Sequence, residues 1–87
     1  KYYDYRDEFY PGYFLSIGMT GDDVKRLQQF LYQICVRKKN IPGVRVDGTF
    51  DSLTESSVKA IQKMANLPEN GVVGPAPWYQ IVEMSKS

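Results

Sequence analysis

Apolar residues recur at helical spacing in three segments of the chain. In the first segment, over about 21–35, one helix face carries Val24, Leu27, Leu31 and Ile34. In the second, from Asp51 or Ser52 to about Asn66, the apolar face is Leu53, Ser57, Ala60 or Ile61, and Met64. In the third, a short helix that ends near Met84, the face is Trp78, Ile81 and Val82. The pattern predicts an all-α fold, a small module of three helices with short turn loops.

Each predicted helix has a suitable residue at its start. Thr20 stands three residues before Asp23, the arrangement of a capping box, so we expect its hydroxyl to cap the first helix. Asp51 or Ser52 can cap the second helix. Pro77 suits the first turn of the third helix, because proline lacks the amide that would otherwise be unpaired there.

The chain also contains a weak internal repeat. Residues 47–50 (Asp-Gly-Thr-Phe) match residues 70–73 (Asn-Gly-Val-Val), and each run leads into a predicted helix. Gln28 and Gln62 occupy equivalent places in the first two helices. For both we favour a bond from the side-chain amide to the backbone of a neighbouring turn over contact with a ligand. One such unit is too small to bury its apolar face alone, so two units must pack on each other.

The first 14 residues differ from the rest, because they show no sustained helical or strand period. Their aromatic residues are Tyr2, Tyr3, Tyr5, Phe9, Tyr10, Tyr13 and Phe14. We interpret 1–14 as a linker or arm whose aromatic side chains pack on the domain, in preference to a platform for a ligand. The domain is predicted over 15–84, and 85–87 is predicted to be a tail.

Composition and charge narrow the classes of function. A chain of 87 residues supports one domain. Its net charge of +1 argues against a nucleic-acid partner. No stretch of the sequence is long and apolar enough for a membrane span. The chain has no histidine, which removes the Ser-His-Asp and Cys-His nucleophile arrangements and the usual zinc sites. We therefore expect a protein that is not an enzyme, with no metal and no cofactor.

Many spaced positions between Leu15 and Val82 resemble one known family. They are Gly18, Gly21, Val24, Leu27, Gln28, Leu31, Asp47, Gly48, Thr49, Phe50, Thr54, Val58, Gln62, Leu67, Asn70, Gly71, Val72, Val73, Gly74 and Trp78. The pattern is similar to the peptidoglycan-binding domains of bacterial cell-wall hydrolases and spore-associated proteins. The sequence departs from that family at Asp51, Ser57, Ile61 and Pro77, where glycine, alanine, phenylalanine and threonine are usual.

The resemblance implies a three-helix fold, an extracellular or cell-envelope location, and a non-catalytic role that anchors an attached catalytic or tandem domain to peptidoglycan. A shallow groove between the turn loops and the helix starts is then expected to take the ligand, because helix-start amides suit the carboxylates of stem peptides. The candidate ligand-binding residues are Asp47, Phe50, Asp51, Asn70 and Tyr79. We expect Trp78 to pack in the core in preference to stacking on a ligand, and Tyr79 to be exposed.

Three alternatives remain open. The cations of the loop after the first helix, Arg37, Lys38, Lys39 and Arg45, are interpreted as solvated in preference to attracting carboxylates of the wall. The same fold without wall binding would be a structural or protein-interaction module, which an exposed patch of Tyr2, Tyr5 and Phe9 would favour. A glycoside hydrolase would need paired carboxylates, but capping explains Asp22 with Asp23, and Asp51 with Glu55, without catalysis.

Overall fold

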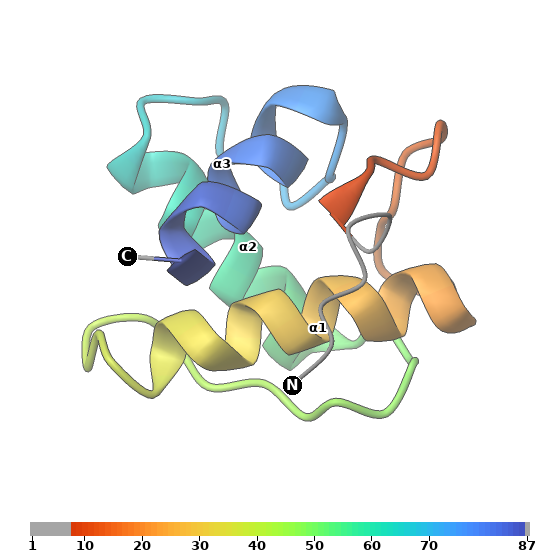
Figure 1. The fold of residues 1–87 in the computed structure, drawn as a ribbon, viewed down its shortest axis with the longest axis horizontal. Helices are drawn as coiled ribbons and strands as arrows, with labels where there is room; N and C mark the ends of the chain where they lie inside the picture. The colour runs from red at the N-terminus through yellow and green to blue at the C-terminus, as the bar shows by residue number, and fades with distance from the viewer. Residues whose placement is uncertain (1–7, 87) are drawn as a thin grey trace.

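The computed structural model describes residues 8–86 and contains three α-helices. They are α1 (Asp22–Cys35), α2 (Ser52–Met64) and α3 (Pro75–Lys86). Helix α1 runs along one side of the molecule, and α2 and α3 lie across it (Figure 1). Within the described residues no strand forms, and β-pairing is limited to two isolated bridges, Leu15 with Val73 and Thr20 with Thr49. The predicted all-α fold of three helices is confirmed.

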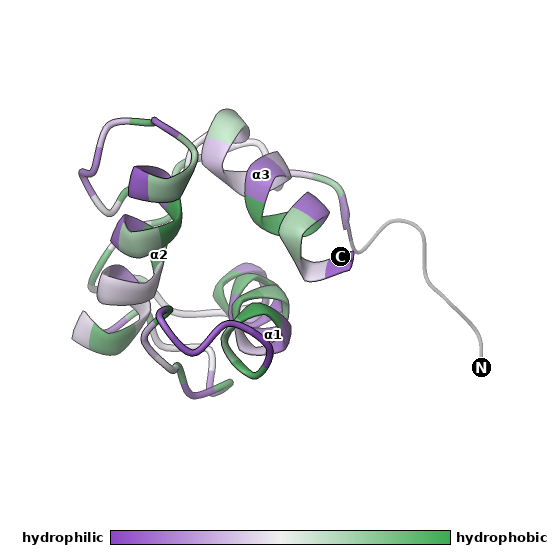
Figure 2. Cartoon of the chain, turned by 90° about the vertical axis from the view of Figure 1, so that its left-hand side faces the viewer, coloured by the Kyte–Doolittle hydropathy of each residue, from purple (hydrophilic) through white to green (hydrophobic). Residues whose placement is uncertain are grey.

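The three helices enclose one hydrophobic core. Figure 2 shows α1 nearly end-on, below α3 and beside the lower part of α2, with hydrophobic positions of α2 and α3 turned toward the middle of the molecule. The buried apolar residues are Leu15, Val24, Leu27, Leu31, Ile34, Ile41, Phe50, Val58, Ile61, Val73, Trp78, Ile81 and Val82. They include every apolar position predicted for α1 and α3, so both of those faces are confirmed.

The predicted face of α2 is wrong at its two ends. Leu53 and Met64 are 41% and 47% exposed. The buried side of the helix instead carries Thr54, Ser57, Val58, Ile61 and Gln62. The face is rotated by about one residue because Thr54 and Gln62, which are polar, turn inward to form hydrogen bonds. Apolar spacing cannot find positions that are buried for their hydrogen bonds.

The start of α1 also differs from the prediction. Gly21 is the N-cap residue, and no side chain caps the helix, so the predicted Thr20 cap is wrong. The backbone of Thr20 is used in the bridge to Thr49, and the Gly21 amide donates to the Gly48 carbonyl at 2.9 Å. Gly21 has φ +129°, a conformation that glycine tolerates and other residues rarely adopt. The chain therefore enters α1 through Gly21, directly after the bridged Thr20, and not from a capping box.

Helix α3 extends past its predicted end. It begins at Pro75, so Pro77 lies in its first turn as predicted, and it continues to Lys86. Ser85 is buried, and its hydroxyl donates to the Val82 carbonyl at 2.6 Å. Residues 85 and 86 are therefore the last part of a packed helix, which differs from the predicted tail, while Ser87 lies outside the described residues.

Residues 8–14 lie against the helices. The indole Nε1 of Trp78 donates to the Glu8 carbonyl at 2.8 Å, and the Tyr10 ring meets the Trp78 ring edge-on with 6.1 Å between centroids. Tyr10 therefore packs on the domain, as expected for the arm, whereas Phe9 and Phe14 are exposed. The aromatic residues Tyr2, Tyr3 and Tyr5 lie outside the described residues.

One buried polar atom suggests a stabilising substitution. The Oγ of Ser57 is fully buried and has no hydrogen-bond partner among residues 8–86. Because a buried hydroxyl without a partner loses its hydration, Ser57→Ala is expected to raise the free energy of unfolding by about 1 kcal/mol, measured by urea denaturation. Ser56→Ala, at the exposed neighbouring position, is the control and should change stability by less than about 0.5 kcal/mol. A loss of stability in Ser57→Ala would contradict this prediction.

Candidate functional site

Two turns, 47–50 and 70–73, are each held by a buried glutamine of the preceding helix. In the first turn, Oε1 of Gln28 accepts from the amides of Asp47 and Gly48 at 2.9 and 2.7 Å. Its Nε2 donates to Asp47 Oδ1 at 3.2 Å and to the Thr49 carbonyl at 2.8 Å. Asp47 Oδ1 also accepts from the Thr49 amide at 3.0 Å, so the side chains of Gln28 and Asp47 together bind the turn backbone.

The second turn repeats this arrangement. Oε1 of Gln62 accepts from the Gly71 amide at 2.9 Å, and its Nε2 donates to Asn70 Oδ1 and to the Val72 carbonyl, both at 3.0 Å. Asn70 Oδ1 accepts from the Val72 amide at 3.0 Å, as Asp47 Oδ1 does in the first turn. The prediction that both glutamines bond to a turn is confirmed, and the internal repeat corresponds to a repeated hydrogen-bond network.

A short segment, 15–21, joins the two turns. Leu15 exchanges two backbone hydrogen bonds with Val73, at 2.8 and 3.2 Å. Farther along the segment, the Phe50 amide donates to the Met19 carbonyl, and the Gly18 amide donates to the Phe50 carbonyl, both at 2.9 Å. The turns 47–50 and 70–73 are therefore fixed to the two ends of one segment. We call the surface formed by 15–21 and the two turns the turn face.

The candidate residues Asp47 and Asn70 lie exposed on the turn face. In each, one oxygen is already used to hold the turn, while Asp47 Oδ2 and Asn70 Nδ2 have no partner among the described residues. Phe50 is different, because it is 1% exposed and part of the core. Its side chain is not presented to a ligand, and its counterpart in the repeat, Val73, is buried as well.

Asp51 is the N-cap of α2, one of the two capping residues predicted. Its Oδ1 accepts from the Thr54 amide at 3.0 Å and from the Thr54 hydroxyl at 3.1 Å. The bond from the Thr54 amide is the main cause that holds the pKa of the Asp51 carboxyl below its usual range, and Arg45 contributes a smaller attraction. Asp51 therefore stabilises the helix as a carboxylate, whether or not it also meets a ligand.

This cap predicts a pH dependence. Because the pKa of Asp51 is lower in the folded state than its ordinary value of 3.8, its stabilisation is present above that value and is lost as the pH falls through the folded pKa. At pH 7 the variant Asp51→Ala is expected to unfold with about 1 kcal/mol less free energy than the wild type. The difference between the two proteins, followed by urea denaturation from pH 7 to pH 2, should shrink below about pH 4. A difference that stays constant over that range would contradict a charged cap.

The remaining candidate, Tyr79, stands on α3 and is 48% exposed, while Trp78 beside it is fully buried. Both placements confirm the expectations from the sequence. The Tyr79 hydroxyl accepts from the Tyr10 amide at 3.2 Å. Tyr79 is thus tied to the segment 8–14, whereas Asp47, Asp51 and Asn70 belong to the turn face and the start of α2.

Three of the four carboxylates considered for hydrolysis, Asp23, Asp51 and Glu55, are engaged in structural contacts. Asp23 accepts a hydrogen bond from the Tyr13 hydroxyl and pairs with Arg26 at 3.0 Å. The Tyr13 bond is the first cause, and Arg26 a further one, that keeps the pKa of Asp23 below its usual range. Glu55 lies 3.9 Å from Lys59. A general acid requires a raised pKa, so Asp23 and Asp51, whose pKa values are lowered, do not suit that role. Among residues 8–86 no group of three or more acidic, histidine or cysteine side chains is placed to hold a metal ion.

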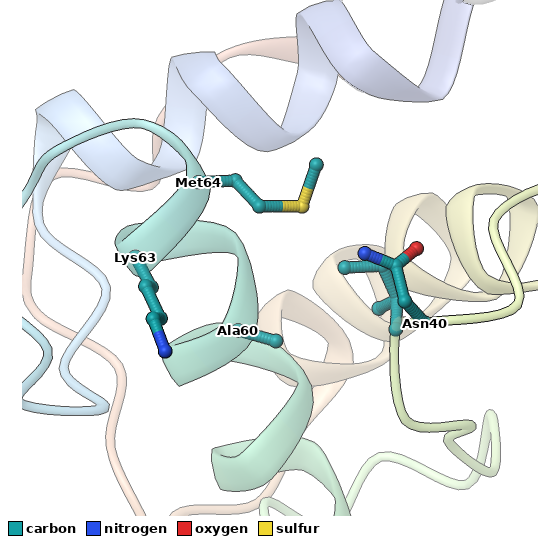
Figure 3. Close-up of a pocket in the computed structure, with 5 residues that line it drawn as sticks. Asn40, Ala60, Lys63 and Met64 are labelled. Atoms are coloured by element: carbon teal, nitrogen blue, oxygen red, sulfur yellow. The ribbon is translucent and has the colours of Figure 1, made fainter.

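A second surface feature was not predicted from the sequence. A depression of about 510 Å³ lies between the loop that follows α1 and the C-terminal half of α2 (Figure 3). It is lined by Asn40, Ile41, Ala60, Lys63 and Met64. The lining residues come from two segments that share no sequence motif. Met64, which is exposed, was the one residue that could have indicated the depression, but its helical spacing predicted a core position.

Comparison with known proteins identifies the family. Residues 20–81 match the sequence model of the family described as "Putative peptidoglycan binding domain". The chain is 34% identical over 65 residues to the N-acetylmuramoyl-L-alanine amidase CwlL of Bacillus licheniformis. The match covers 75% of the chain and 17% of the amidase, so the chain spans about a sixth of that curated relative.

Two solved structures have a similar fold. The N-terminal domain of SleB superposes with a TM-score of 0.73 at 23% identity, over 88% of this chain and 99% of that domain. A peptidoglycan-binding protein from Clostridioides difficile, in complex with glutamine hydroxamate, gives a TM-score of 0.72 at 27% identity, over 85% of this chain and 43% of that protein. No helix within residues 8–86 is long and apolar enough to span a bilayer. The family match includes both glutamines and both turns of the repeated network, and the chain therefore belongs to the peptidoglycan-binding domain family.

Proposed function

We propose that this chain is a non-catalytic module that binds peptidoglycan and holds an attached enzyme or envelope protein at the bacterial cell wall, outside the cytoplasm. The observation that carries the proposal is the family match over residues 20–81, which includes both turns of the turn face and the last two residues of its joining segment, Thr20 and Gly21. The similarity to one sixth of an amidase supports the role as an attached part. Weak binding suffices for such a role, because tethering raises the local concentration of the attached enzyme at its polymeric substrate.

The turn face offers polar groups for this contact. Each turn presents one group that the fold does not use, the acceptor Oδ2 of Asp47 in the first and the donor Nδ2 of Asn70 in the second. Amides and hydroxyls of a wall fragment can pair with an acceptor and a donor of this kind. We propose Asp47, Asn70 and, beside the segment 8–14, the exposed ring of Tyr79 as contacts, with Asp51 acting through the position of α2.

Co-sedimentation with insoluble peptidoglycan tests the proposal. The purified chain is expected to pellet with the wall material and to stay in solution without it. Alanine at Asp47 or Asn70 would break the turn as well as the contact, so the informative variants are Asp47→Asn and Asn70→Asp. The two turns of the repeat have Asp and Asn at this position, so either residue fits it. Each exchange keeps Oδ1, which holds the turn, and changes the outward group between the acceptor Oδ2 and the donor Nδ2. Both variants should fold and pellet less.

A matched pair of variants tests the aromatic contact. Tyr79→Ala is compared with Tyr32→Ala on α1, because the two rings are 48% and 50% exposed. Tyr79→Ala should pellet less than Tyr32→Ala. Failure of the wild type to pellet at any workable concentration would overturn the proposed function. Equal pelleting of wild type and all of these variants would leave the function and overturn the proposed contacts.

An interaction module without wall binding is the second candidate. Phe9, Phe14 and Ile17 are each at least half exposed, which is unusual for large apolar side chains near one another in the sequence. Of the patch expected from the sequence, Phe9 is exposed, and Tyr2 and Tyr5 lie outside the described residues. This candidate is favoured if the folded chain does not pellet with peptidoglycan and the triple variant with serine at Phe9, Phe14 and Ile17 abolishes self-association or binding to the natural neighbouring domain.

A further inference from the structure

The depression beside α2 has the size and lining of a small ligand site. Its volume of about 510 Å³ falls within the roughly 300–1,000 Å³ typical of small-molecule pockets. In Figure 3, Ala60 and Met64 point from α2 toward Asn40 in the opposite wall, and Lys63 stands at the rim on the outer side of the helix. Ile41, which is buried, and the half-buried Ala60 add apolar surface to the lining.

The polar groups of the lining are not used by the fold. Neither the side-chain amide of Asn40 nor the ammonium of Lys63 has a hydrogen-bond or ion-pair partner among residues 8–86. Lys59, one turn earlier on α2, is paired with Glu55. None of the five lining residues carries a carboxylate, and Lys38 and Lys39 immediately precede Asn40. The depression therefore has one available cation, one available carboxamide and no carboxylate in its lining.

These groups specify the chemistry of a ligand. An ammonium on a flexible four-carbon stem suits a carboxylate, and a carboxamide pairs with a peptide bond, which has one donor and one acceptor. The apolar surface of Ile41, Ala60 and Met64 suits short aliphatic side chains. Sugar rings are bound mostly by an aromatic face beside polar groups, and none of the five lining residues is aromatic.

We propose that this depression binds the carboxylate-bearing end of a short aliphatic peptide, such as the end of a peptidoglycan stem peptide. The terminal carboxylate pairs with Lys63, the Asn40 amide bonds to the last peptide bond, and the methyl groups of the terminal residues contact Ile41, Ala60 and Met64. The choice of a peptidoglycan peptide as the ligand rests on the proposed function. In this assignment the depression recognises the peptide part of the wall and not the glycan.

The experiment is a nuclear magnetic resonance titration of the ¹⁵N-labelled chain with N-acetyl-D-alanyl-D-alanine. This probe has one carboxylate and two methyl side chains. Its C-terminal amide is the matched ligand without the charge, and chitotetraose is the glycan probe. The acid is expected to shift the backbone amides of residues 40, 41, 60, 63 and 64, while the C-terminal amide binds more weakly and chitotetraose leaves these signals in place.

Two variants in the lining and one control variant outside it locate the site. Lys63→Gln should weaken binding of the acid by about fivefold, the upper end for a solvent-exposed ion pair. Lys59→Gln removes the same charge from the same helix outside the depression, and it should leave binding unchanged. Ala60→Leu fills the depression with a larger side chain that is compatible with a helix, so it should abolish the shifts. Circular dichroism establishes that Ala60→Leu is folded, and if it is not, the comparison of the two lysine variants still decides the question.

The results separate this inference from the proposed function. If the wild type pellets with peptidoglycan but the acid shifts no signal of the lining, or Lys63→Gln and Lys59→Gln weaken it equally, the depression is not the peptide site and the proposed function stands. If the acid binds at the lining and the wild type does not pellet, the peptide site stands and the proposed function falls. Shifts caused by chitotetraose at the lining would also overturn the assignment to a peptide.

Discussion

Gln28→Ala is expected to lower the free energy of unfolding by about 4 kcal/mol, since alanine cannot replace the side chain's five hydrogen-bond contacts, three of which share the two N–H groups of Nε2. Its Oε1 serves two turn amides, and its Nε2 bonds to Asp47, to the Thr49 carbonyl and to the Thr54 hydroxyl of α2. The residue is fully buried, so the groups left behind do not regain water. Native proteins are stable by about 5–15 kcal/mol, so a loss of about 4 kcal/mol removes a large fraction of the total stability.

Urea denaturation at 25 °C checks this value, and two further variants make the test specific. Gln29→Ala, at the exposed next position of α1, should change the free energy of unfolding by less than about 0.5 kcal/mol. Gln62→Ala removes three hydrogen bonds of the second turn and should cost about 2–3 kcal/mol. We expect the losses in the order Gln28, Gln62, Gln29. A cost for Gln28→Ala below about 1 kcal/mol would mean that water replaces the network.

The parts of the fold that follow from local chemistry could be predicted from the sequence. The faces of α1 and α3 consist of apolar residues at helical spacing, and Asp51 precedes α2 as a capping residue should. The role of the two glutamines was also predictable, because the internal repeat places a buried amide before an Asp-Gly or Asn-Gly turn each time. A buried glutamine needs partners, and a turn has unpaired amides to offer.

The errors arise where contacts between distant residues decide the outcome. Thr20 has the local sequence of an N-cap, but its backbone pairs with Thr49, which lies almost thirty residues later, and Gly21 takes the cap position instead. On α2, Thr54 is buried because it meets Gln28 of another helix. Neither contact has a signal in a window of ten or fifteen residues, which is the range in which periodicity is informative.

Only part of the candidate site could be predicted, again because contacts between distant residues decide the rest. Asp47 and Asn70 were found as exposed turn residues, while the burial of Phe50 depends on its two backbone bonds to the segment 15–21. The depression that includes Asn40 and Lys63 is formed by a loop and a helix more than fifteen residues apart. Its lining residues are ordinary when taken one at a time, and only the fold places an unpaired carboxamide and an unpaired ammonium beside one apolar surface.

The segment 8–14 leads to the second large expected effect. Trp78 is the largest fully buried side chain, and the segment covers one side of it: the Glu8 carbonyl accepts from the indole, and the Tyr10 ring packs on the indole edge. Arg26 lies 5.0 Å from the centroid of the indole and donates to the Phe9 carbonyl at 3.1 Å, so the segment also holds this cation in place. We propose that the structural domain includes residues 8–14 and does not begin at Leu15.

Two truncated chains, one starting at Glu8 and one starting at Leu15, test this boundary without any assumption about the residues before Glu8. The chain that starts at Leu15 should be less stable by about 3 kcal/mol, because it leaves the indole N–H without its partner and removes the aromatic pair. It also exposes apolar surface of Trp78 to water. The free energy of unfolding from urea denaturation gives the difference, and a red shift of the tryptophan fluorescence maximum, present only in the shorter chain before denaturation, reports the exposed indole. Equal stability with unshifted fluorescence would return the boundary to Leu15 and leave 8–14 as a linker.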